Sequence, residues 1–166
     1  MKRILFLCCF TIIFVQAFSQ TEPLIIDLSE ETVYKVVGEM PMFPGCEDLE
    51  SNKREQSLCG REKMTAYLYK HIKYPTQAKA QQLEGTCVIQ FVVLKDGRIA
   101  NPKIVRGISE DIDQHAIELV SSMNDLEKPW TPGKKDGLAE NVYLTVPIRF
   151  KLDQTTNWDK AVRKGG

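Results

Sequence analysis

The chain has 166 residues, of which 43% are hydrophobic and 27% are charged. These are ordinary values for a globular protein, and they exclude a disordered, collagen-like or coiled-coil chain. Lys and Arg together number 22, as do Asp and Glu, so the formal net charge is zero. A dedicated nucleic-acid binder carries a basic excess, so we exclude that class as well.

The first residues have the three parts of a secretory signal peptide. Lys2 and Arg3 precede an apolar run over residues 4–15, and small residues follow at the two positions that signal peptidase reads. The sequence therefore predicts a cleavable signal peptide over residues 1–19 and export from the cytoplasm. An uncleaved membrane anchor is the alternative.

Export changes the expected chemistry of the cysteines, because disulfides form and persist in oxidising compartments. Beyond residue 19 the chain keeps Cys46, Cys59 and Cys87. Cys87 lies in a strand-like run and is expected to be a buried apolar residue. Cys46 and Cys59 flank a polar stretch and are the expected disulfide pair. The loop that they close would stabilise the fold by about 3 kcal/mol. Two unpaired thiols are the alternative.

An extension over residues 20–60 precedes the helical patterns. We expect a loose, acidic lead-in over residues 20–32, a short strand over residues 33–37, a segment over residues 40–45 that two prolines keep extended, and a charged connection over residues 46–60. Apolar residues recur every fourth position from Met64, and Tyr74-Pro75 ends this helix, which we place from residue 61. Thr76 caps a second short helix that Gly85 closes. Ser109 or Asp111 caps a third amphipathic helix. Its expected inner residues are Ile112, Ala116, Leu119, Val120 and Met123.

Three strands are predicted from their β-branched and alternating residues. Residues 86–94 and 98–105 flank Asp96-Gly97, which we take as a two-residue hairpin turn. In residues 142–152 the apolar side chains alternate strictly with polar ones, so one face is buried and the other is wet. The hairpin register expected from this turn pairs Val93 with Ala100, Phe91 with Pro102 and Ile89 with Ile104.

Proline predicts the order of these strands, because it removes a donor and is largely confined to edges or bulges. Pro102 and Pro147 therefore place their strands at the edges of the sheet, with residues 86–94 in the centre. The predicted fold is α+β, a three-stranded antiparallel sheet of order 2-1-3 with two helical regions on one face. The last strand then has a long free edge, which a protein must manage, cover or use.

Catalytic patterns are weak in this sequence. His71 and His115 are the two histidines, and both are expected to be structural. Neither a metalloprotease, a nucleophile-elbow, a Walker-type nor a dinucleotide-binding motif is present. Trp130 is expected to be a core anchor. We predict no enzyme activity, no cofactor and no metal site.

An ordered set of motifs resembles the C-terminal domain of TonB energy transducers. It begins with Tyr74-Pro75 and Ala78, continues with Glu84-Gly85-Thr86 before a strand, and ends with a closing strand around Pro147. The resemblance covers residues 61–152, which we take as the domain, and leaves residues 153–166 as a polar tail. The remaining matching positions lie between Thr86 and the closing strand. They are Phe91, Asp96, Gly97, Trp130, Thr131, Pro132 and Gly133.

The resemblance implies a periplasmic domain that adds the TonB box of outer-membrane receptors as a strand beside its own last strand. Tyr74 and Pro75 match a second contact region of the family. Gly85, Asp96, Gly97, Trp130, Pro132 and Gly133 are assigned structural roles. The partner-binding residues carried over from the last strand are Asn141, Val142, Tyr143, Leu144, Thr145, Val146 and Arg149.

The chain departs from a full transducer in its N-terminal part. Residues 1–19 contain no histidine, and residues 20–60 are not rich in proline and span about 35 Å as a flexible coil. An adapter that uses the same strand edge for another protein, without coupling to the proton gradient, is therefore the alternative function. Contact with the inner-membrane proton-channel complex is expected only if the chain is anchored, and a homodimer through the free edge is left open.

Overall fold

The computed structural model describes residues 22–50 and 52–152. The predicted signal peptide over residues 1–19 and the polar tail over residues 153–166 lie outside the described residues. The elements in chain order are β1 (Val33–Tyr34), α1 (Lys53–His71), α2 (Thr76–Ala80), β2 (Gly85–Val93), β3 (Ile99–Arg106), α3 (Glu110–Ser121), the 3-10 helix η1 (Ser122–Asp125), β4 (Gly133–Lys135) and β5 (Leu138–Phe150).

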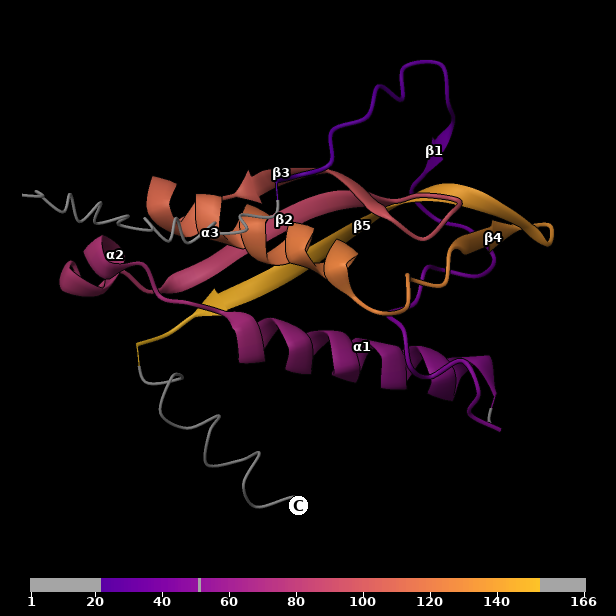
Figure 1. Ribbon diagram of the computed structural model, residues 1–166, viewed down its shortest axis with the longest axis horizontal. Helices are drawn as coiled ribbons and strands as arrows, with labels where there is room; N and C mark the ends of the chain where they lie inside the picture. The colour runs from indigo at the N-terminus through magenta and orange to yellow at the C-terminus, as the bar shows by residue number, and fades with distance from the viewer. Residues whose placement is uncertain (1–21, 51, 153–166) are drawn as a thin grey trace, which may run out of the picture.

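One sheet forms the centre of the molecule, in the order β1-β5-β2-β3, with β4 paired to β5 (Figure 1). β2 pairs antiparallel with both β3 and β5, which confirms the α+β fold and the 2-1-3 order of the three predicted strands. The sheet has five strands rather than three, because β1 and β4 add to β5. β1 joins β5 across about a hundred residues of sequence, a pairing that no local pattern indicates.

The main core lies between the sheet and the helices, which all contribute to it from one side. α3 packs across β2 and β3, and α1 runs beside β5 (Figure 1). Every residue predicted for the inner stripe of the third helix is buried, as the helical spacing requires, although the last of them, Met123, lies in η1 and not in α3. Trp130 and Phe43 also belong to this core, and its largest fully buried side chains are Phe91, Phe150, Met123, Ile89, Ile99, Ile112 and Ile148.

The β2–β3 hairpin forms as predicted, but its loop has three residues rather than two. Leu94 accepts from Gly97 and donates to Arg98, so Lys95, Asp96 and Gly97 form the loop, with Gly97 at φ +83°. A Gly in this left-handed position typically closes a three-residue hairpin loop.

The register near the loop is therefore one residue away from the expected one. Val92 faces Ala100, and Val93 faces Ile99 instead of Ala100. An irregularity around Asn101, where φ is +51°, restores the predicted pairing of Ile89 with Ile104 further along. The pairing expected for Phe91 and Pro102 falls within that irregularity and does not occur.

Two helix boundaries also differ from the sequence prediction. α1 begins at Lys53, eight residues before the predicted start, because the Asn52 side chain caps it by accepting from the Glu55 backbone N–H at 3.1 Å. α1 therefore crosses the domain boundary placed at residue 61. The second helix was predicted to end at Gly85. Instead, Gln82 takes the left-handed conformation after α2, with φ +53°, and Gly85 is the first residue of β2.

The extension that was expected to be loose packs on the opposite face of the sheet. Leu24, Ile26 and Leu28 contact a second apolar cluster of Val92, Leu94 and Ala100. Asn101 fixes this segment, because its side chain accepts from the Ile26 N–H and donates to the Ile26 carbonyl, each at 2.8 Å. Within residues 22–50 and 52–152 we find no helix long and apolar enough to cross a membrane.

Candidate functional site: the open edge of β5 and its groove

The two edges of β5 differ. β2 pairs with β5 continuously from Val142 to Phe150. The other edge pairs with β1 at Asn141 and Val142, and β4 pairs with residues 138–140, before the stretch that β2 covers. Among the described residues no strand pairs with that outer edge over residues 143–150, and we call this stretch the open edge. The expectation of a free edge from Asn141 onward is thus wrong for its first two residues, because β1 occupies them.

The faces of β5 alternate as predicted. Val146, Ile148 and Phe150 are buried on the helix side, and Leu144 is half-buried. Thr145, Pro147 and Arg149 are exposed on the other side. Tyr143 departs from this pattern because the extension covers it: it packs beside the cluster of Val92, Leu94 and Ala100.

A groove with a volume of about 480 Å³ lies between α1 and the open edge. Residues 144–148 of β5 form one wall, α1 forms the other, and residues 40–43 line the space beside Trp130. The α1 side chains along the groove are Ser57, Arg61, Met64, Thr65, Leu68 and Tyr69, together with the backbone of Gly60.

Residues 40–43 reach the groove because three features hold them there. Met42 and Thr131 exchange two backbone hydrogen bonds of 3.0 Å, and Glu39 and Lys134 exchange another pair. Gly60 lets this segment approach α1 closely, since a Cβ at that position would lie 2.5 Å from Met42 Cγ. Pro41 and Pro44, on either side of Met42 and Phe43, keep the segment extended, as predicted from the sequence.

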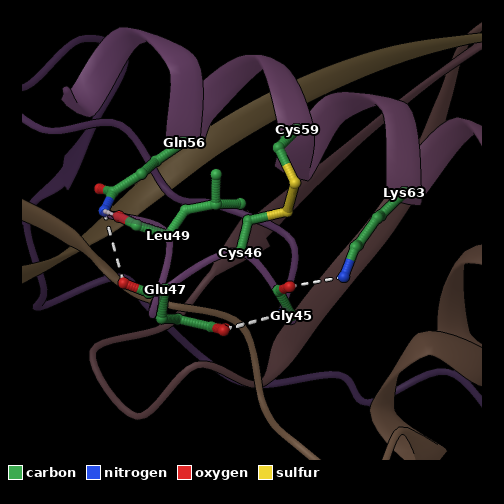
Figure 2. The surroundings of a disulfide bond; sticks show 7 residues. All are labelled: Gly45, Cys46, Glu47, Leu49, Gln56, Cys59 and Lys63. Atoms are coloured by element: carbon green, nitrogen blue, oxygen red, sulfur yellow. Dashed lines mark hydrogen bonds between the residues drawn. A yellow bond between two sulfur atoms is a disulfide. The ribbon is translucent and has the colours of Figure 1, made fainter. Parts of the chain in front are cut away.

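The predicted disulfide between Cys46 and Cys59 is present, with Cα atoms 6.1 Å apart (Figure 2). It ties the loop after residue 43 to α1, directly before the groove-lining Gly60. The Gln56 side chain donates to the carbonyls of Glu47 and Leu49, and the Lys63 ammonium donates to the Gly45 carbonyl (Figure 2). The loop is thereby fastened to α1 along two turns.

Glu47 adds a charge to the same loop. Partial burial works against its ionisation. It is outweighed by several smaller effects together: the Gly45 backbone N–H donates to both carboxylate oxygens at 2.9 Å, its own backbone N–H donates as well, and the charges of Lys128 and Lys63 favour the anion. The pKa of Glu47 is therefore below its usual value, and the carboxylate stays ionised near neutral pH.

Trp130 is the core anchor that the sequence predicted, and it also lines the groove. It is 3% exposed and packs edge-on against Phe43 and Phe91, with ring centroids 5.4 and 5.8 Å apart. The Trp130 backbone explains why residue 97 is a glycine, since a Cβ there would lie 2.2 Å from the Trp130 carbonyl oxygen. Among the described residues the Trp130 indole N–H has no hydrogen-bond partner.

Two other residues with predicted structural roles have a visible physical reason. Asp96 accepts from the Arg98 backbone N–H at 3.0 Å and so supports the hairpin loop. Gly133 begins β4, where a Cβ would lie 2.6 Å from Val142 Cγ2. Pro132 is half-buried directly before it.

Asn141, predicted to contact a partner, uses its side chain inside the fold. It is 2% exposed, accepts from the Lys95 backbone N–H at 3.0 Å and donates to the Glu31 carboxylate. Asn141 thus joins the hairpin loop, the extension and β5. A buried amide with this set of partners serves the structure.

Tyr74 and Pro75 do not line the groove. The Tyr74 ring packs edge-on against Phe150 at the far end of β5, 6.0 Å between centroids, and its hydroxyl donates to the Leu83 carbonyl. Both residues border a separate open cavity of about 510 Å³ against the first turns of α3. Any contact they make with a partner is therefore separate from the groove.

Two observations concern metal and thiol chemistry in the part of the chain that is described. No cluster of three or more His, Cys, Asp or Glu side chains is placed there to hold a metal ion. Cys87 is the free cysteine of these residues; burial, reinforced by Asp113, raises the pKa of its thiol to about 12. Such a thiol is protonated and unreactive near neutral pH.

Fold and groove together define a small α+β domain with a partly open edge strand. A family model described as the Gram-negative bacterial TonB protein C-terminal matches residues 70–152, which is half of the chain. The chain belongs to this family. The resemblance inferred from the ordered motifs is thereby confirmed.

Two curated relatives are similar to the chain, both named Protein TonB, from Helicobacter pylori strains 26695 and J99. Each is 30% identical over 84 residues, which is 49% of this chain. The alignments cover 26% and 27% of the relatives. The chain therefore matches about a quarter of their length.

Two solved structures are also similar to the chain. A TonB C-terminal domain from Helicobacter pylori has a TM-score of 0.46 and 22% identity, covering 63% of this chain and 87% of that one. A TonB C-terminal domain from Pseudomonas aeruginosa has a TM-score of 0.37 and 22% identity, covering 49% and 78%.

Proposed function

We propose that this chain is a periplasmic TonB-like domain that binds the TonB box of outer-membrane receptors by strand addition and serves TonB-dependent transport. Family membership supports the class of partner, and the signal-like N-terminus supports the compartment. The partner-binding residues in this proposal are Tyr143, Leu144, Thr145, Val146 and Arg149, with Asn141 and Val142 as structural neighbours. Tyr74 and Pro75 remain candidates for a second contact.

The observation that carries the proposal is the open edge beside the groove. An unpaired strand edge offers backbone donors and acceptors to an extended peptide. Here that edge borders a groove of about 480 Å³, which leaves room for an added chain. β1 already pairs in parallel at Asn141 and Val142, so an added strand would continue the edge from Tyr143.

Pro147 indicates which residues of β5 present their backbone outward. A proline is tolerated in a paired strand where its nitrogen faces away from the neighbouring strand, and Pro147 lies opposite Val88 of β2. Residues two apart in a strand share this orientation. We therefore infer that Thr145 directs its backbone N–H toward the open edge and not toward β2.

This inference gives a direct test, the substitution Thr145→Pro. It removes an outward donor and leaves the ladder with β2 intact, so binding of a synthetic TonB-box peptide should weaken by about tenfold or more. Titration calorimetry measures the affinity, and circular dichroism checks that the variant is folded.

The matched control is Thr145→Val, which keeps the backbone donor and loses the hydroxyl that accepts from Gln90. It should bind the peptide nearly as the parent does. If a folded Thr145→Pro protein binds as tightly as the parent, strand addition at this edge is wrong. If the parent binds no TonB-box peptide, the result favours the alternative adapter function. A periplasmic pull-down would then identify the partner.

A further inference from the structure

The groove offers more than backbone hydrogen bonds, because the pleat of β5 directs part of any added strand into it. Leu144, Val146 and Ile148 point toward the helix side of the sheet. Side chains of an added strand that lie level with these residues would point the same way. They would therefore enter the space beneath α1, while the alternate side chains stay in water.

That space is apolar where an inward side chain would reach. Met42, Phe43, Met64, Leu68 and Trp130 line it, and polar side chains lie along α1 at its rim. A dry cavity of about 150 Å³ is enough to hold a benzene ring. The groove, at about 480 Å³, has room for an added backbone together with a large side chain.

The two methionines suit a pocket that adapts to its occupant. A methionine side chain is unbranched and polarizable, so it fits apolar groups of different shape. Met64 projects from α1 and is half-buried, and Met42 comes from the extended segment that the disulfide and Gly60 hold against the helix. The backbones of α1 and of the extended segment are thus held in place, while their two methionine side chains can change rotamer to fit the occupant.

We propose that the groove selects its extended peptide by one large apolar side chain of the leucine, methionine or phenylalanine class, which inserts against Met64 level with Val146. Val146 is the central residue of the β5 wall, with Leu144 and Ile148 on either side. This proposal rests on the proposed function, since it requires a strand added at the open edge. It concerns which peptides bind, whereas strand addition concerns how they bind.

The test uses a TonB-box peptide and variants in which each position in turn carries Leu or Ser. Titration calorimetry against the folded parent protein should find one position where Ser weakens binding by about tenfold or more relative to Leu. Its neighbours on either side, which point to water, should differ little. Equal affinities of the Leu and Ser peptides at every position overturn the proposal.

Met64→Gln tests the pocket itself, because it keeps the length of the side chain and makes its end polar. It should reduce the preference for Leu over Ser to a few-fold. Glu62→Gln introduces the same side chain on an exposed part of α1 outside the groove and should leave the preference unchanged. An unchanged preference in Met64→Gln overturns the assignment of this pocket.

The two proposals fail in different ways. If Thr145→Pro abolishes binding but Leu and Ser peptides bind alike, strand addition stands and side-chain selection is wrong. If no peptide binds to the parent protein at all, both proposals are overturned.

Discussion

His115 lies on α3 and links that helix to the segment before Pro75. The Lys73 backbone N–H donates to His115 Nε2 at 2.9 Å, and His115 Nδ1 lies 3.7 Å from the Glu118 carboxylate. The Nε2 atom can accept only when it carries no proton. Burial lowers the pKa of His115, with the positive charge of Lys73 acting in the same direction and Glu118 opposing both.

This depressed pKa predicts how stability depends on pH. In the unfolded chain His115 takes up a proton below about pH 6.5, whereas in the folded protein it does so only at a lower pH. The contribution of His115 to the free energy of unfolding is therefore present above about pH 6.5 and is lost as the pH falls. Urea unfolding of the parent should therefore show a lower free energy of unfolding at about pH 5.5 than at about pH 7.5. His115→Gln should be less sensitive over this range. If parent and variant lose equal stability, another group causes the effect.

At the scale of single elements, α1 depends on contacts that lie outside its own sequence. Its N-terminal half carries Cys59 and Gly60, and both hold the chain before the helix in place. The disulfide closes a sequence separation of 13 residues, and the Gln56 and Lys63 side chains fasten the same loop (Figure 2). The position of one groove wall therefore depends on this bond.

Removal of the bond should affect both stability and the groove. The double substitution Cys46→Ser with Cys59→Ser should lower the free energy of unfolding by about 3 kcal/mol. It should also weaken peptide binding, because the loop that follows residues 40–43 loses its covalent attachment to α1. Urea unfolding and titration calorimetry measure the two effects.

A reductant provides the control for this prediction. It should reproduce the loss in the parent and have no further effect on the double variant, because Cys87 is a buried free thiol. Alkylation should reach Cys87 only after unfolding. If peptide binding is unchanged after both treatments, the disulfide does not support the groove.

At the scale of the whole molecule, the sheet is covered on both faces near the β2–β3 hairpin. The helices cover one face, and the extension covers Val92, Leu94 and Ala100 on the other. Asn101 carries this arrangement, since its backbone takes a left-handed conformation and its side chain bonds Ile26 on both sides. The extension is thus part of the folded domain.

Asn101→Gly isolates the side chain from the backbone conformation, because glycine adopts a positive φ without strain. It should lower the free energy of unfolding by about 1–2 kcal/mol through the two lost hydrogen bonds. The Ile26 amide should also exchange its hydrogen faster. Urea unfolding and hydrogen exchange measure these effects.

Asp136→Gly is the matched control, since Asp136 has φ +53° in the exposed β4–β5 turn. It should be neutral or slightly stabilising. If Asn101→Gly behaves in the same way, the bonds to Ile26 do not hold the extension.

Local pattern in the sequence was enough for the features that depend on neighbours along the chain. The strict alternation in residues 142–152 predicted the two faces of β5, and the helical spacing predicted the buried stripe of α3. Two prolines predicted the strand order, because a missing donor excludes the centre of a sheet. The disulfide also followed from two cysteines that flank a polar stretch in a chain predicted to be exported. The start of α1 was missed, although Asn52 and Glu55 form a capping pair there.

Tertiary structure decided the features that join distant segments. The pair Asp96-Gly97 is compatible with a hairpin loop of two or of three residues. In the structure the loop has three residues, the register is shifted, and Gly97 lies against the Trp130 backbone. β1 closes the outer edge at Asn141 and Val142, and the groove combines residues 40–43 with α1 and β5. A periodic pattern records how much of a residue is buried and on which side, but not which distant segment covers it. The elements, their faces and the central strand order therefore follow from local pattern, whereas the packing of distant segments sets where the edge stays open and what borders it.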